Sequence, residues 1–297
     1  MNCLYPFVLH MSDSDSEAAG VPLLESPSST PEEPSTQKRK RATESDAQST
    51  SKRAAKRKKT KAPKDIVDDA LDEELGVNHA LAHMNSQLLA DHLLQRTKRF
   101  HDDLSLVELE DLALPASAIT DTTSFTDSRT TDQFPKFLET FADSTGTSTK
   151  TATKKKKQKL SQAATEKGSP HTLVIAGAGL RAADLTRTLR PYQTKESQVA
   201  KLFAKHIKLK EAVEMCKKTR MGIGVGTPQR LIDLLEDGAL SVENLERVVV
   251  DASHIDVKKR GILDMRETQG PLMKVLCREE FREKFGKEEG GVELLFF

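Results

Sequence analysis

The sequence predicts an α/β fold for residues 170–297, with a parallel sheet that helices cover on both faces. Two observations support this prediction. Short β-type runs alternate with helical patterns along this stretch, and the strand-like runs are mostly apolar, without a regular alternation between apolar and polar residues. Strands of this composition are buried on both faces, which is typical of parallel sheets with helical crossover connections. About 128 residues are enough for a modest domain of this kind.

The expected elements follow one another closely. Strands are expected at Thr172–Ala176, Val199–Ala204, Met221–Val225, Val248–Val250 and Val292–Phe297. Helices are expected at Leu180–Leu189, Lys208–Lys217, Pro228–Leu235 and Leu272–Phe285. Pro228 is well placed, because proline is favoured in the first turn of a helix. Together these elements make the alternating pattern on which the fold prediction depends.

The rest of the chain has little material for a core. The sequence of 297 residues contains no tryptophan and 2 tyrosines, and 31% of its residues are charged. Such a composition cannot offset the entropy of ordering the whole chain, so a large part is expected to be disordered. The net charge of +1 conceals segregated blocks: residues 38–64 carry 12 basic and 2 acidic residues, and residues 65–143 carry 17 acidic and 5 basic residues.

Residues 1–64 are predicted to form a disordered, basic tail. Ser, Thr, Pro and acidic residues come first, and two basic clusters separated by a polar spacer follow. The clusters are typical of a bipartite nuclear localisation signal that also contacts RNA phosphates, and the alternative is a merely solvating tail. The residues concerned are Lys38, Arg39, Lys40, Arg41, Lys52, Arg53, Lys56, Arg57, Lys58 and Lys59.

Residues 65–143 are predicted to form an acidic, partly helical docking arm. Apolar residues recur near helical spacing between Asp65 and Phe100, which indicates one or two amphipathic helices. Phe134, Phe137 and Phe141 repeat this spacing. Two destinations remain open for these apolar stripes: a groove on a larger assembly, or the chain's own folded domain. A linker rich in Lys and Thr is expected at residues 144–169.

Cysteine content and hydropathy predict a soluble intracellular protein. Cys3, Cys216 and Cys277 are few, far apart and without metal-ligand spacing, which fits a reducing compartment. The mildly apolar start lacks the basic region of a signal peptide, and Met11 is a second candidate for the natural start. No apolar run approaches the roughly 18 residues that cross a bilayer. No membrane association is expected.

A glycine pattern at Gly177–Ala182 matches the G-x-G-x-x-A fingerprint of dinucleotide-binding folds. That fingerprint also requires an acidic residue about twenty positions later, and residues 199–206 contain none. Close packing between a strand and the following helix explains these glycines better. No cofactor is therefore expected. His79 and His83 are spaced as metal ligands on a helix, but they lack the intervening glutamate and a third ligand, so no metal site is expected either.

Two further segments carry a resemblance to the first RecA-like domain of DEAD-box RNA helicases. Thr227-Pro228-Gln229-Arg230-Leu231 is similar to the family's T-P-G-R-L element, which holds an RNA phosphate. Val248–Val250 followed by Asp251-Ala252-Ser253-His254 is similar to its D-E-A-D strand and motif. The resemblance implies a parallel-sheet, RecA-like half-domain and makes Arg181, Thr227 and Arg230 candidates for RNA contact. Alternatively, Thr227 simply caps the helix that begins at Pro228.

The departures from that family predict a chain without ATPase activity. Ala252 replaces the carboxylate that positions the attacking water, and His254 replaces the final aspartate. The sequence contains no G-x-x-x-x-G-K-[ST], so the predicted half-domain lacks a P-loop. We therefore expect Asp251 and His254 to have structural roles, with no catalytic residue and no small-molecule substrate. An RNA-dependent NTPase with unorthodox motifs is the alternative.

A narrower resemblance covers residues 170–297 and extends into the arm. Arg190–Glu196, Leu202–Lys208, Gly222–Pro228 and Asp251–Met265 are similar to the CMS-one family of helicase-related nuclear proteins. This resemblance implies a nucleolar assembly factor in rRNA processing, associated with the small-subunit pre-ribosome (the ninety-S particle, or processome). Pre-ribosomal proteins are the implied partners, with pre-rRNA as a further one.

Overall fold

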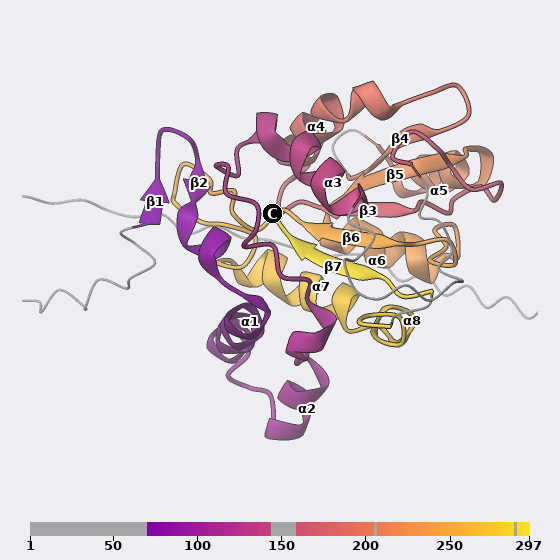
Figure 1. Ribbon diagram of the computed structural model, residues 1–297. Helices are drawn as coiled ribbons and strands as arrows, with labels where there is room; N and C mark the ends of the chain where they lie inside the picture. Colours follow the sequence, from indigo (N-terminus) through magenta and orange to yellow (C-terminus); the bar gives the residue numbers. More distant parts are fainter. Residues whose placement is uncertain (1–69, 144–158, 205–206, 288–289) are drawn as a thin grey trace, which may run out of the picture. The chain divides into compact units, whose positions relative to one another are not determined.

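A five-stranded parallel sheet forms the centre of the computed structural model, which describes residues 70–143, 159–204, 207–287 and 290–297. The strand order is β4-β5-β3-β6-β7 (Figure 1). The strands are β3 (Thr172–Ile175), β4 (Gln198–Leu202), β5 (Met221–Gly226), β6 (Arg247–Val250) and β7 (Glu293–Phe296). In the central strand, Thr172 lies opposite Ile223 of β5 and Arg247 of β6. The predicted parallel α/β fold is confirmed.

Helices cover both faces of the sheet because successive strand residues are apolar. Val174 and Val249 face one core, whereas Leu173, Ile175 and Val250 face the other. Helix α4 (Gly179–Thr188) packs on the first core. The second core is covered by α5 (Leu209–Lys218), α6 (Pro228–Glu236), α7 (Arg266–Leu276) and α8 (Glu279–Arg282). Burying strand residues on both faces removes the alternation that exposed sheets show.

The helix expected at Leu272–Phe285 was predicted wrongly. The structure begins α7 six residues earlier, at Arg266, and separates it from α8 after Leu276. Gly270 and Pro271 both weaken a helix interior, so propensity alone does not favour a helix that runs through them. Tertiary packing overrides that preference. A Cβ atom at Gly270 would lie 3.0 Å from Nε2 of His101, so glycine lets the end of the arm's long helix approach α7 closely.

The segment from residue 70 to residue 143 contains less helix at its start than predicted. Leu71–Asp72 (β1) and Val77–Asn78 (β2) form a small antiparallel pair in place of a helix. Asp72 accepts backbone hydrogen bonds from Glu74 and Leu75, both at 3.0 Å, and Gly76 has a φ of 64°. This local hydrogen bonding competes with helix formation. The helices that do form are α1 (Ser86–Phe100), α2 (Leu106–Asp111) and α3 (Phe134–Asp143).

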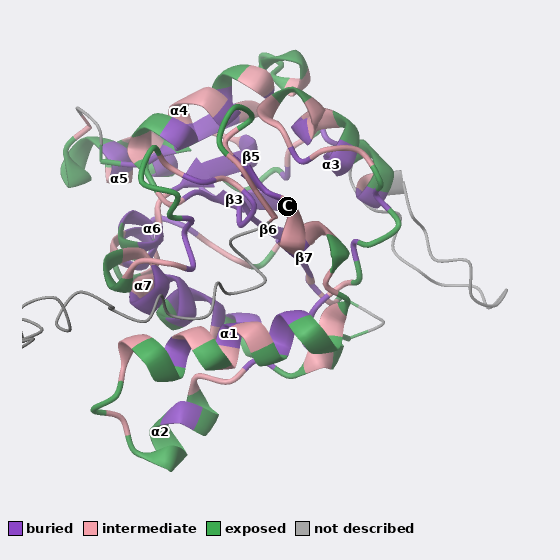
Figure 2. Cartoon of the chain, turned by 90° about the vertical axis from the view of Figure 1, so that its left-hand side faces the viewer, coloured by how far each residue is buried: buried purple, intermediate pink, exposed green. Residues whose placement is uncertain are grey.

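The apolar stripes of this segment pack on the chain's own sheet. Leu89 and Leu93 of α1 join the core beneath α7, and Gln269 of α7 donates a hydrogen bond to Thr97 at 2.7 Å. Figure 2 shows buried and exposed residues alternating along α1. On the opposite face, Phe134 and Phe137 of α3 are fully buried, and their rings lie 4.8 and 4.9 Å from that of Phe297. Of the two destinations left open, the structure shows the intramolecular one.

This segment also covers the β7 edge of the sheet. Ile119 forms a parallel bridge with Leu294, and the Thr120 N–H donates to the Leu294 carbonyl at 2.8 Å.

The last part of the predicted linker, residues 159–169, packs on the folded unit. Leu160 is buried, and Arg220 donates to the Ala164 carbonyl at 2.9 Å. The linker expected at residues 144–169 can therefore extend no further than residue 158.

Candidate functional site

The predicted site residues lie where three parallel strands end. Arg181 is in the first turn of α4, after β3, and Asp251 directly follows β6. Thr227 and Arg230 begin α6, after β5. Because the carboxyl ends of parallel strands share one edge of the sheet, all of these residues belong to the region where open α/β sheets usually bind ligands.

Asp251 and Arg181 form a buried, two-pronged ion pair at this edge. The Arg181 Nε donates to Asp251 Oδ2 at 2.8 Å, and Nη2 donates to Oδ1 at 2.9 Å. The Asp251 side chain is 1% exposed, and the Arg181 side chain is 8% exposed. Burial alone would lower the pKa of Arg181, but the charge and hydrogen bonds of Asp251 outweigh burial and raise that pKa. Arg181 therefore keeps its positive charge at neutral pH.

This geometry limits what Asp251 can do chemically. A carboxylate that organises a metal ion must direct an oxygen toward the ion. Here each oxygen accepts a hydrogen bond from the same guanidinium, and the remaining terminal nitrogen of Arg181 donates to the hydroxyl of Thr131. Thr131 belongs to a 3₁₀ turn (Thr131–Gln133) that immediately precedes α3. The segment of residues 70–143 thus supplies a further hydrogen-bond acceptor to Arg181.

The next three residues tie neighbouring elements together through their backbone. The N–H groups of Ala252 and Ser253 both donate to the Phe297 carbonyl at 2.8 Å. Asn78 of β2 donates to the Ser253 carbonyl at 2.7 Å, and His254 forms a bridge with Val77. The motif-like segment is consequently a junction between the sheet and the β1–β2 pair.

His254 has an environment that favours its neutral form. Burial is the main cause that lowers its pKa, and the positive charge of Arg181 acts in the same direction. The negative charge of Asp251 opposes them without reversing the shift. The structural role expected for His254 from the sequence stays a prediction.

Arg230 and Thr227 do not take part in the ion pair of Arg181 and Asp251. Arg230 is 8% exposed, and its Nη2 donates to the carbonyl of Ile207 at 3.1 Å. Its Nη1 is buried without a partner among the residues that the structure describes. Thr227 occupies the N-cap position of α6, with φ −100° and ψ 149°, but its side chain makes no capping hydrogen bond. RNA contact by Arg181, Thr227 and Arg230 stays a prediction.

Sequence reasoning missed a buried arginine in the acidic segment. Arg129 is 1% exposed and donates to the Phe296 carbonyl at 2.7 Å and to the Thr122 hydroxyl at 2.9 Å. Its guanidinium carbon lies 5.8 Å from the centre of the Phe137 ring. Burial lowers the pKa of Arg129 to about 10, so the group remains charged. A lone basic residue in an acidic, apolar stretch was the available signal.

The glycine pattern and the histidine pair do not form a ligand site in the described parts of the chain. A Cβ atom at Gly177 would lie 3.2 Å from the Ile262 Cβ, so the close neighbour belongs to the segment before α7 and not, as predicted, to the helix that follows the strand. Within residues 70–143, 159–204, 207–287 and 290–297, no group of three His, Cys, Asp or Glu side chains could hold a metal ion. In the same ranges no helix is long and apolar enough to span a bilayer. The basic clusters from Lys38 to Lys59 lie outside these ranges.

Comparison with known proteins identifies the family. The sequence profile of CMS1, described as "U3-containing 90S pre-ribosomal complex subunit", matches residues 34–297. Protein CMS1 of Chaetomium thermophilum is 54% identical over 82% of this chain and 92% of its own length. Protein cms1 of Schizosaccharomyces pombe is 29% identical over 73% of this chain and 72% of its own.

Among solved structures, the yeast DEAD-box splicing factor Prp28 aligns with a TM-score of 0.33 and 19% identity, over 43% of this chain and 27% of that chain. The chain combines a parallel α/β sheet with a junction at which Arg181 donates hydrogen bonds to both oxygens of Asp251. It belongs to the CMS1 family, as the resemblance predicted. The members of that family take part in ribosome biogenesis.

Proposed function

We propose that this protein is a non-catalytic assembly factor of the small-subunit pre-ribosome, acting as a scaffold for pre-ribosomal proteins and pre-rRNA in the nucleolus. One observation carries the non-catalytic part of the proposal. Asp251, the only carboxylate at the motif-like junction Asp251–His254, has both oxygens occupied by Arg181. A hydrolytic site needs a carboxylate free to orient water or a metal ion.

The family description supports the assembly part of the proposal, because it names members as subunits of the U3-containing 90S pre-ribosomal complex. The basic clusters between Lys38 and Lys59 would supply nuclear import and sequence-independent contacts with rRNA phosphates. The folded unit would present its surface to neighbouring subunits. No cofactor and no membrane take part in this function.

A turnover assay tests the non-catalytic part. Purified full-length protein should hydrolyse ATP no faster than a buffer control, with or without RNA, while an active DEAD-box helicase in the same assay responds to RNA. The alternative is an RNA-dependent NTPase. Hydrolysis above background that is lost in Asp251→Ala would establish this alternative and overturn the proposal.

Gradient sedimentation tests the assembly part. Tagged protein should migrate with large pre-ribosomal particles in a nuclear extract, and purification through the tag should recover small-subunit precursor RNA. Replacing the ten basic residues between Lys38 and Lys59 by glutamine should reduce nuclear accumulation of a fluorescent fusion. Migration only as a free protein would contradict the assembly role.

A further inference from the structure

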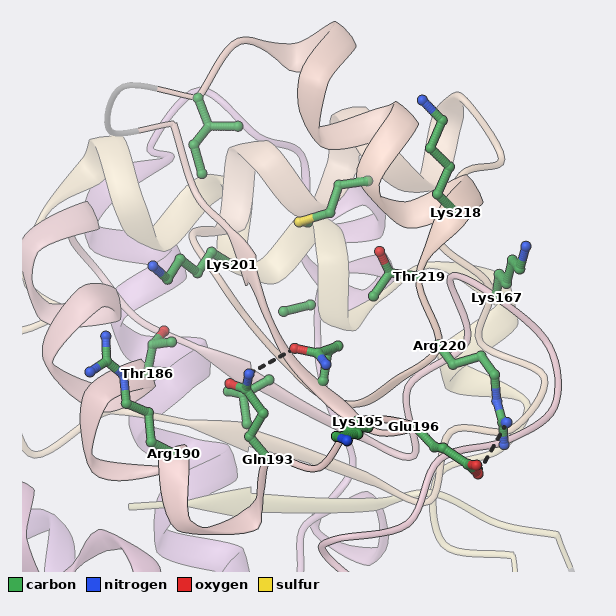
Figure 3. Close-up of a pocket in the computed structure, with 15 residues that line it drawn as sticks. Lys167, Thr186, Arg190, Gln193, Lys195, Glu196, Lys201, Lys218, Thr219 and Arg220 are labelled. Atoms are coloured by element: carbon green, nitrogen blue, oxygen red, sulfur yellow. Dashed lines mark hydrogen bonds and ion pairs between the residues drawn. The ribbon is translucent and has the colours of Figure 1, made fainter.

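A basic cleft lies beside β4, the edge strand opposite the edge that Ile119 covers. Its volume is about 1090 Å³. Figure 3 shows Arg190 and Lys201 on one side and Lys167, Lys218 and Arg220 on the other, with Lys195 between them. These six basic side chains line the cleft together with a single acidic one, Glu196. None of the six was predicted as a site residue, although Arg190 and Lys195 lie in a segment that carries the family resemblance.

Four of the six basic side chains have no carboxylate partner among the residues that the structure describes. Lys218 pairs with Glu214 at 2.9 Å, and Arg220 approaches Glu196 at 3.6 Å. Lys167, Arg190, Lys195 and Lys201 are exposed and form no ion pair within the described part of the chain. Like charges repel, so gathering four of them in one cleft costs free energy unless an anion neutralises them.

The walls of the cleft are fixed by the fold. Lys201 projects from β4, and Arg190 directly follows the end of α4. Two backbone hydrogen bonds hold Arg220 in place, because its guanidinium donates to the carbonyls of Ala164 at 2.9 Å and Ala163 at 3.3 Å. Gln193 donates to Gln198 at 2.8 Å across the floor. The fold therefore sets the backbone positions of these basic residues before any ligand arrives.

We propose that this cleft binds the phosphate backbone of single-stranded RNA, an inference that rests on the proposed function and assigns it a surface. An extended polyanion carries charges at regular intervals and can meet cations on both walls. An acidic peptide would also need pockets for its side chains, and the apolar lining is limited to Val199, Ala200, Ile207 and Met215. No aromatic side chain lines the cleft, so bases would not stack and sequence preference would be weak.

This surface differs from the RNA candidates predicted from the sequence. Arg181 is committed to Asp251, and Arg230 donates to a backbone carbonyl and is 8% exposed. Arg190 and Lys201 are exposed and have no such partner. Phosphate binding along β4 would also leave the motif-like junction Asp251–His254 untouched.

The test compares two double variants of the full-length chain. Both are made with the ten basic residues between Lys38 and Lys59 replaced by glutamine, so that the tail does not dominate the measurement. Arg190→Glu with Lys201→Glu changes the cleft. Lys258→Glu with Lys274→Glu changes exposed residues elsewhere by the same net charge. Affinity for a labelled uridine oligonucleotide is measured by fluorescence anisotropy at several salt concentrations, after circular dichroism confirms folding.

Loss of two phosphate contacts should weaken binding by about tenfold and reduce the salt slope by about 1.4, since each single-strand contact contributes about 0.7. The control pair should change affinity less than about twofold. Equal losses in both pairs, or no loss in either, would overturn the proposal. So would competition by polyglutamate as strong as that by unlabelled RNA, which would indicate an acidic protein partner. Gradient sedimentation remains a separate test, so the cleft can fail while the assembly role stands.

Discussion

At the scale of single residues, the buried Arg181–Asp251 pair matters most for stability. Changing Arg181 to alanine leaves Asp251 without its ion-pair partner. Asp251 directly follows β6 and is 1% exposed, so its charge would be buried and uncompensated. Breaking a buried pair on one side costs about 3–5 kcal/mol. We expect Arg181→Ala to lower the free energy of unfolding by this amount, measured by urea denaturation.

The control for this prediction is Arg187→Ala on the same helix. Arg187 pairs with Asp184 at 2.7 Å, but its side chain is 63% exposed, so solvent screens the interaction. This change should leave the urea midpoint nearly unaltered. Replacing both buried partners, as in Arg181→Met with Asp251→Leu, should restore much of the loss because no lone charge remains. Equal midpoints for Arg181→Ala and Arg187→Ala would contradict the prediction.

His171 predicts how stability responds to acid. Burial, and next the charge of Arg247, lower the pKa of His171 to about 4 from 6.5. The unfolded chain therefore takes up a proton at a higher pH than the folded chain. The contribution is complete above the unfolded pKa and is lost as pH falls from about 6.5 toward 4. Between about pH 7 and pH 5 the free energy of unfolding should fall by roughly 2 kcal/mol from this residue.

Urea denaturation at several pH values checks this effect. His171→Gln should flatten the slope between pH 7 and pH 5, because the titrating group is removed. Burial also lowers the pKa values of His92 and His254, so a smaller slope in the same direction should remain. An unchanged slope in His171→Gln would show that His171 does not carry the acid response.

At the scale of elements, local sequence patterns predicted the strands well and some helix boundaries poorly. Val248–Val250 and Met221–Val225 are continuous apolar runs, which only a buried strand or helix can use. The start of helix α7 was misplaced because Gly270 makes room for His101, which directly follows α1 and lies far away in the sequence. The ion pair at the site escaped for the same reason: 70 positions separate Arg181 and Asp251, and only the strand order brings them together.

Helix α3 supplies the prediction at this scale. Phe137 is fully buried between Phe125, Phe141 and Phe297, with ring centres 4.8 to 5.3 Å apart. Phe137→Ala should lower the free energy of unfolding by about 3–5 kcal/mol, the usual cost of truncating a core phenylalanine. The neighbouring Lys136→Ala should have little effect, since Lys136 is 63% exposed. Thermal melts followed by circular dichroism distinguish the two.

At the scale of the whole molecule, the segment from residue 70 to residue 143 and the sheet pack as one compact unit. The segment places α1 on one face, α3 on the other, and Ile119 along the β7 edge. Composition and charge predicted an acidic docking arm here. They depend only on the residues of the segment and carry no information about what those residues contact. An amphipathic stripe looks the same whether it binds another protein or its own chain, so only the three-dimensional structure decides between these destinations.

The last prediction concerns division of the chain at residues 144–158. A fragment of residues 159–297 would expose Phe297, the β7 edge and the face beneath α1, and an uncovered edge strand promotes aggregation. Expressed alone, this fragment should be insoluble or lack a cooperative melt. Expressed together with a fragment of residues 60–143, it should become soluble and co-purify with it. A control fragment carrying Phe134→Asp and Phe137→Asp should fail to rescue, because charged groups cannot occupy that core. Cooperative melting of residues 159–297 alone, at nearly the full-length temperature, would instead establish the segment as a detachable arm.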